Sequence, residues 1–288
     1  MREFPTFPSG RHPERRTLAS LSREEIVALI EADLQAAYPP QGSAISESTG
    51  PDSIWRITGI PDKFFNNVTH VSWPGSEAAH RVRDMIGELD DLGVDYSWWI
   101  GPSSSPANLP DLVEAGGMTF QEDYPGMAID LQNLRDESAV PEGLEIARVE
   151  DAGGLARFVR AYTIASDAEA AIEPGLLHLL ARSGYGDSDH WTHYIGALDG
   201  VAAATTSVFT GAGAAGIYLV ATVPAQRRRG IATALVVEAL RRAWHAGYSI
   251  GTLQTSKEGL GLYRALGFRE YCRFAFYVRE HLRRPKAE

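Results

Sequence analysis

The stretch VPAQRRRGIATAL, from Val223 to Leu235, joins an apolar segment to the start of a helix-like one. It places three consecutive arginines in a chain whose formal net charge is −10, and small residues follow them at once. Pro224 ends the strand, while Gly230 and Ala232 leave the backbone accessible where the helix begins. The first turn of a helix has N–H groups without partners and carries partial positive charge. With arginines beside it, this turn predicts a strand–loop–helix unit that binds a pyrophosphate.

The segment from Gly200 to Gln226 contains no charged residue. It is long enough to span a bilayer, but glycine, alanine, threonine and serine dominate it, and TGAGA (Thr210 to Ala214) lies in its middle. This composition favours two apolar strands joined by a glycine-rich hairpin. We therefore expect no membrane span here.

The second half continues with a helix over 231–246, a strand, a short helix and a last strand. The same order occurs in the first half, where a helix from Ser76 to Gly93 precedes a strand, a short helix and the strand Pro125 to Leu131. A period of about 150 residues indicates duplicated domains rather than a solenoid. We expect an α/β (α+β) fold with two tandem domains, each a mixed, mostly antiparallel sheet flanked by helices.

The expected domain boundary lies in the polar segment from Gln132 to Gly143, which contains a proline and no hydrophobic period. We assign 1–20 to a flexible N-terminal tail, 21–138 to the first domain and 139–288 to the second. The first helix is expected to start after Ser22, which heads a capping-box pattern with a glutamate three residues later.

Two motifs of the second half occur in a specific order and separation. The pattern V-P-x-x-R-x-x-G-x-A-T-x-L, read from Val223, is followed about 35 residues later by LYRALGF, Leu262 to Phe268. The first resembles the acetyl-coenzyme A signature of the GNAT acyltransferase superfamily, and the second resembles that superfamily's element L-Y-x-x-x-G-F. The resemblance covers about residues 144–278. It implies an N-acetyltransferase that moves an acetyl group from acetyl-coenzyme A to a primary amine of a small molecule or peptide by direct attack.

The resemblance also implies roles for single residues. The loop backbone would hold the pyrophosphate, and the end of the preceding strand would flank the pantetheine arm and the thioester. Tyr263 would protonate the departing thiolate, since its pKa lies not far from that of a thiol and its hydroxyl sits on a stiff arm. Ser256 stands where many members have asparagine, so a hydroxyl would replace an amide there. The expected coenzyme A contacts are Ala221, Thr222, Val223, Arg227, Arg228, Arg229, Gly230, Ile231, Ala232, Thr233 and Ser256.

The general base is left open by the sequence. A base or a water chain must take a proton from the amine before attack, and neither GIYLVATV nor GTLQT contains an acid. The candidates that would border the acceptor are Asp167, Glu169, Glu173, His190 and His193. Each of these residue types is more often a solvated surface group than a catalytic base.

The first half lacks the phosphate motif, because PGSEA (Pro74 to Ala78) stands where the second half has AQRRRGIA. We therefore expect one coenzyme A site per chain. This half resembles the degenerate N-terminal domain of tandem GNAT proteins. Trp98 and Trp99 are adjacent on a strand, so one is expected to face the core and the other to face outward.

The amino-acid composition limits the kinds of binding partner that we expect. The acidic balance argues against a nucleic-acid partner, and the single cysteine, Cys272, excludes intramolecular disulfides and suits the cytoplasm. We expect a small amine-bearing acceptor, no metal, no membrane partner, and a monomer or homodimer. Three alternatives stay open: a different acyl donor (a longer acyl-coenzyme A or a carrier-bound group), a non-catalytic acyl-coenzyme A sensor, and an assembly protein with a vestigial site. The intact arginine–glycine loop and Tyr263 argue against the last two.

Overall fold

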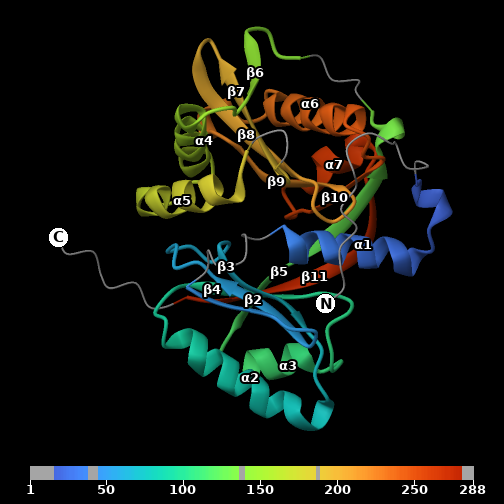
Figure 1. Ribbon diagram of the computed structural model, residues 1–288, viewed down its shortest axis with the longest axis vertical. Coiled ribbons are helices and arrows are strands. Elements are labelled where there is room, and N and C mark those ends of the chain that lie inside the picture. Colours follow the sequence, from blue (N-terminus) through green and yellow to red (C-terminus); the bar gives the residue numbers. More distant parts are fainter. Residues whose placement is uncertain (1–15, 38–44, 136–139, 186–188, 281–288) are drawn as a thin grey trace. The chain divides into compact units, whose positions relative to one another are not determined.

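The residues that the computed structural model describes are 16–37, 45–135, 140–185 and 189–280 (Figure 1). The chain forms two compact units, and neither is one continuous stretch of sequence. Unit 1 takes residues 1–37 and 126–271, and unit 2 takes residues 38–125 and 272–288.

Unit 1 contains a mixed sheet in which the strand order is β5-β10-β9-β8-β7-β6. Neighbouring strands are antiparallel except for β9 and β10, which are parallel. The uncharged segment forms β8 and β9, as predicted from its composition. The strand bounds are β5 Thr119–Asp130 (in unit 1 from Gly126), β6 Leu144–Arg148, β7 Trp191–Leu198, β8 Val201–Phe209, β9 Ala215–Thr222 and β10 Ile250–Gln254.

Helices α4 (Ala152–Ala165) and α6 (Ile231–His245) cover opposite faces of this sheet (Figure 1). Side chains alternate between the two faces along a strand. Tyr194 of β7 belongs to the core cluster beneath α6, while the neighbouring His193 lies against Phe158 of α4 with ring centroids 4.9 Å apart. The remaining helical elements of unit 1 are η1 Leu18–Ser20, α1 Arg23–Ala36, η2 Leu131–Asn133, η3 Ala170–Ile172, α5 Glu173–Ser183, η4 Pro224–Gln226 and α7 Leu260–Leu266.

Helix α1 begins as the sequence predicted. The Ser22 hydroxyl accepts a hydrogen bond from the Glu25 amide at 3.2 Å, and the Glu25 carboxylate accepts one from the Ser22 amide at 2.7 Å. The expected loose tail does not extend to residue 20, because Leu18 is buried and its amide donates to Asp130 at 2.7 Å. Residues 1–15 of that tail lie outside the described residues.

Unit 2 contains a second mixed sheet in the order β1-β2-β3-β4-β11, in which β3 and β4 are the parallel pair. Trp98 is fully buried in the core cluster that contains Val82 of α2 and Leu109 of α3. The bounds are β1 Ser46–Thr49, β2 Ser53–Ile57, β3 Asn66–Val71, α2 Gly75–Asp90, β4 Tyr96–Ile100, α3 Leu109–Ala115 and β11 Arg269–Arg279 (in unit 2 from Cys272).

The expectation that one of the two adjacent tryptophans faces outward is wrong. Trp99 is only 7% exposed, because Tyr124, Phe274 and Phe276 surround its ring at centroid distances of 4.8, 6.4 and 4.6 Å. Aromatic side chains from β5 and β11 therefore cover the second face of the sheet at this point.

The sequence repeat is visible in the topology of the two units. The order β3-α2-β4-α3-β5 matches the order β9-α6-β10-α7-β11, with a parallel pair on either side of the long helix. The closing strands are exchanged: Gly126–Asp130 of β5 pairs with β10, and Ala275–Arg279 of β11 pairs with β4. The expected division into 21–138 and 139–288 therefore does not coincide with the compact units, and its boundary lies outside the described residues.

Among the described helices, none is both long enough and apolar enough to cross a membrane.

Candidate active site

Strands β9 and β10 separate after a short paired stretch. Their ladder consists of Gly251 with Ala215 and Thr252 with Gly216, whereas the other edge of β9 stays paired with β8 as far as Thr222. Within the described residues, the edge of β9 that faces β10 has no strand partner beyond Gly216. Free backbone groups on such an edge can pair with an extended ligand as an added strand does.

A β-bulge bends β9 inside this opening. The pairing with β8 shifts between Thr205 and Ser207, which face Ala221 and Tyr218, so β9 has one extra residue here. Leu219 takes a positive φ of 49°, and its carbonyl accepts a hydrogen bond from the Thr205 hydroxyl at 2.9 Å. The bulge therefore lies between the position of β9 that pairs with β10 and the end of the strand at Thr222.

The arginine loop, Val223–Arg229, connects β9 to α6 through the single turn of η4. Arg228 has a positive φ of 64° and Gly230 one of 80°, a region that L side chains other than asparagine and aspartate rarely occupy. The first backbone bond of α6 runs from the Ala234 amide to the Gly230 carbonyl at 3.0 Å. The amides of the three residues between them precede the helical ladder, so they are available for the anion binding that the sequence predicts.

The three arginines have different side-chain partners. The Arg227 guanidinium donates to the carbonyls of Thr222 and Ala165, each at 3.0 Å, so it fixes the loop against the ends of β9 and α4. Arg229 donates to the Gln226 side chain. Arg228 is exposed, and its side chain makes no hydrogen bond within the described residues. Of the three, Arg228 is therefore the guanidinium that can turn to a bound phosphate without breaking a contact of the loop.

The other predicted coenzyme A contacts differ in how much of them is accessible. Ile231 is 1% exposed and packs into the core with Leu235, so it can offer a ligand only its backbone. The Val223 amide already bonds to the Ala203 carbonyl at 2.9 Å. The half-buried positions are Ala221, Thr222, Val223, Ala232, Thr233 and Ser256.

Tyr263 lies on α7, and its ring is packed in the core beneath α6. The residue is 7% exposed, and its ring meets Phe268 edge-on at 5.8 Å. The hydroxyl makes no hydrogen bond within the described residues. Burial raises the pKa of Tyr263 well above its usual range, so the hydroxyl stays protonated near neutral pH and can only donate a proton. The raised pKa moves Tyr263 further from the pKa of a thiol than the sequence predicts, so burial makes its hydroxyl a weaker acid.

The family model that matches residues 188–270 is described as an acetyltransferase (GNAT) domain. Residues 188–270 are a GNAT domain. They include β7 to β10, the arginine loop and Tyr263. No curated protein matches the sequence.

Solved structures extend the likeness to both repeats. A GCN5-related N-acetyltransferase from Kribbella flavida matches with a TM-score of 0.65 and 18% identity, over 89% of this chain and 97% of that one. A GCN5-related N-acetyltransferase from Sphaerobacter thermophilus matches with a TM-score of 0.58 and 21% identity, over 74% and 71% of the two chains. A tandem GNAT protein from the clavulanic acid biosynthesis pathway matches with a TM-score of 0.53 and 16% identity, over 90% and 97%. At these identities the likeness concerns the fold, which is a mixed α/β fold of the tandem GNAT type.

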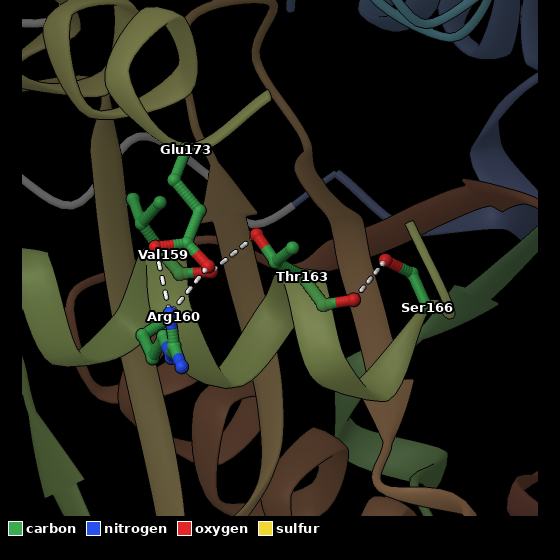
Figure 2. Close-up of polar contacts among 5 residues, drawn as sticks. All are labelled: Val159, Arg160, Thr163, Ser166 and Glu173. Carbon is green, nitrogen blue, oxygen red and sulfur yellow. Dashed lines mark hydrogen bonds and ion pairs between the residues drawn. The ribbon is translucent and has the colours of Figure 1, made fainter. Parts of the chain in front are cut away.

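The acidic residues proposed as bases lie on or near α5, outside the GNAT domain match. Glu173 is held by Arg160 of α4, with its two carboxylate oxygens 3.2 and 3.4 Å from the guanidinium (Figure 2). Both carboxylate oxygens of Glu173 therefore already contact a guanidinium. Asp167 and Glu169 are exposed.

The two histidine candidates of the GNAT domain have opposite surroundings. His190 is exposed. His193 is fully buried, and its Nδ1 lies 2.7 Å from the Ser207 hydroxyl. Burial lowers the pKa of His193 to about 4, so its ring is neutral at pH 7. Its Nε2 has no partner within the described residues.

A buried carboxylate that the sequence did not single out lies at the closed end of the opening. Asp33 of α1 has no exposed surface, and its Oδ2 accepts a hydrogen bond from the Tyr218 hydroxyl at 2.6 Å. A Cβ on Gly216 would overlap this carboxylate, so glycine is the residue that lets it reach β9. No sequence motif marks Asp33, because its partner lies 185 residues further along the chain.

Within the described residues, no three His, Cys, Asp or Glu side chains gather in a way that could hold a metal ion.

Proposed function

We propose that this protein is an acetyl-coenzyme A dependent N-acetyltransferase whose acceptor is a primary amine of a small molecule or peptide. The proposal rests mainly on one observation: an unpaired strand edge and a helix start with free amides follow each other directly along the chain. The unpaired edge of β9 runs directly into the arginine loop and the free amides at the start of α6. A ligand with an amide-bearing arm and a pyrophosphate at one end has the chemistry that these two features bind in sequence.

Transfer requires a nucleophile, a carbonyl and a leaving group in one place. The amine nitrogen forms a bond to the acetyl carbonyl carbon, and the carbon–sulfur bond breaks. The thiolate takes a proton, and we assign Tyr263 as its source, because burial keeps the hydroxyl of this residue protonated. A sensor of acyl-coenzyme A does not need a proton donor at this position, so Tyr263 favours the enzyme.

The test is thiol release from acetyl-coenzyme A, followed across a library of amines that includes amino sugars, amino acids, aminoglycosides and peptide N-termini. We expect release that depends on one class of amine and yields the N-acetyl product by mass spectrometry. Propionyl- and longer acyl-coenzyme A, run in parallel, measure the acyl length that the opening accepts. Binding of coenzyme A without release from any acyl donor would identify a sensor and refute the enzyme.

A further inference from the structure

Asp33 lies where β9 and β10 begin to separate. Its carboxylate rests on Gly216, and Gly216 with Thr252 is the last paired position of the two strands. The residue that bonds it, Tyr218, lies on β9 two positions further into the opening. The side chain of Gln254 on β10 donates to the Ile30 carbonyl of α1 at 3.3 Å and holds the helix over this point. The fold therefore places a carboxylate at the inner end of the candidate active site.

The hydrogen bonding of Asp33 is incomplete. Oδ2 is bonded to Tyr218, but Oδ1 is buried and has no partner within the described residues. The Thr252 hydroxyl beside it is also buried and makes no hydrogen bond of ordinary geometry there. A buried carboxylate oxygen without a donor is destabilising, and a purely structural carboxylate is expected to be fully bonded. Oδ1 is therefore a buried acceptor for which the described residues supply no bonded donor.

Asp33 and Tyr263 lie on opposite faces of the sheet. Ala215 and Ile217 of β9 belong to the same core cluster as Tyr263, on the α6 face. Gly216 and Tyr218 alternate with them and contact Asp33, on the α4 face. A carbonyl held in the opening between β9 and β10 thus has a proton donor on one face and a proton acceptor on the other.

We propose that Asp33 is the general base of the transferase, and that Tyr218 positions its carboxylate. The proposal rests on the function proposed above. The substrate ammonium gives one proton to Oδ1 of Asp33, and the neutral amine then attacks the acetyl carbonyl carbon. As the carbon–sulfur bond breaks, a second proton goes to the thiolate by way of Tyr263, and the third stays on the amide nitrogen. Asp33 returns its proton to water, so the reaction releases coenzyme A, the N-acetyl product and one proton.

The electrostatics of the site agree with this role. Burial raises the pKa of Asp33 to about 7, while the Tyr218 hydrogen bond and the nearby Thr252 hydroxyl lower it in part. The elements packed against Asp33 contribute these two hydroxyls, and no charged side chain, to the change in its pKa. A base with a pKa near the working pH accepts a proton readily and releases it again.

The experiment compares pH–rate profiles of kcat for the parent, Asp33→Asn and Tyr218→Phe, using the best amine from the library. The parent should show a limb that rises with pH through the pKa of Asp33. Asp33→Asn should lose that limb and about a hundredfold in kcat, with coenzyme A affinity within threefold of the parent by titration calorimetry. Tyr218→Phe removes a hydrogen bond that stabilises the charged carboxylate, so its limb should move to higher pH while its high-pH plateau remains.

Two controls separate a base from a structural group. Glu24→Gln changes an exposed carboxylate in the first turn of the same helix, and it should leave the profile unchanged. An O-alkyl hydroxylamine analogue of the acceptor is already neutral at pH 7, so Asp33→Asn should lose far less turnover with it than with the amine.

The outcomes distinguish the two proposals. A parental limb that persists unchanged in Asp33→Asn overturns the role of Asp33 and leaves the transferase intact. If Asp33→Asn does not fold, the Tyr218→Phe variant decides instead. A rising limb at the same pH in Tyr218→Phe as in the parent also overturns the role of Asp33. Absence of thiol release by the parent with every amine and acyl donor overturns both.

Discussion

Replacement of Asp33 by asparagine should stabilise the protein, and the gain should depend on pH. The carboxyl has a pKa of about 7 in the folded chain, against a usual value of 3.8. Because the folded-state pKa is the higher one, the unfolded chain ionises first and stability is lost as pH rises from 3.8 to about 7. A difference of one between the folded and unfolded pKa values corresponds to about 1.4 kcal/mol. Ionised Asp33 therefore destabilises the fold by roughly 4 kcal/mol above pH 7.

Asparagine has the same shape as the protonated carboxyl and never ionises. Asp33→Asn should therefore gain about 2 kcal/mol in the free energy of unfolding at pH 5 and about 4 kcal/mol at pH 7. Above pH 7 the gain should stop growing, because the carboxyl is then charged in both states. Urea unfolding at pH 5, 6, 7 and 8, followed by circular dichroism, measures the series.

Glu24→Gln is the control for this series, since it removes an exposed charge from the first turn of α1. It should give a small, pH-independent loss from the helix dipole. A gain in Asp33→Asn that is equal at pH 5 and pH 8 would show that the carboxyl ionises as it does in water. A loss at all pH values would show that its negative charge is paired in the folded chain.

Three further predictions concern the donor site. Tyr263→Phe should lower kcat about a hundredfold, measured by steady-state kinetics corrected for the folded fraction, while coenzyme A affinity stays within threefold of the parent. A turnover within threefold of the parent would remove the tyrosine from the mechanism. Gly230→Glu, at a φ of 80° where an added Cβ would meet Pro141 Cγ at 3.9 Å, should abolish coenzyme A binding in calorimetry while the circular dichroism spectrum persists. Unchanged affinity would mean that the phosphates bind elsewhere. The same titration on the parent should give one site per chain, and two sites would contradict the interpretation of PGSEA in the first repeat.

The local elements of the fold follow from the sequence because their signals lie within a few residues. Ser22 with Glu25 predicted the start of α1, and the contrast between an uncharged segment and three arginines predicted β9, the loop and α6. The conformation of the arginine loop follows less directly. The sequence does not indicate that the Arg227 guanidinium donates to two backbone carbonyls of the protein, and only the structure shows these bonds.

The long-range features could not be predicted from these patterns. β5 and β11 have the alternation of any buried strand, and that alternation is the same whichever sheet the strand joins. Asp33 occupies a helix position where a carboxylate is usually solvated. Its burial depends on Gly216 and Tyr218, which are near it only after folding.

The exchange of β5 and β11 has a consequence for the order in which the chain can fold during synthesis. Unit 1 needs residues from both ends of its sequence, and α1 leaves the ribosome long before Tyr218, its partner 185 residues later. Unit 2 needs Ala275–Arg279 to cover β4, and these residues are synthesised after all of unit 1. Tandem domains usually fold one after the other during translation. The exchanged strands prevent this order of folding here. Unit 1 cannot be completed before residue 271 is made, and unit 2 cannot be completed before residue 279. Strand edges therefore stay uncovered through most of the synthesis of this region, and the nascent protein should depend strongly on chaperones.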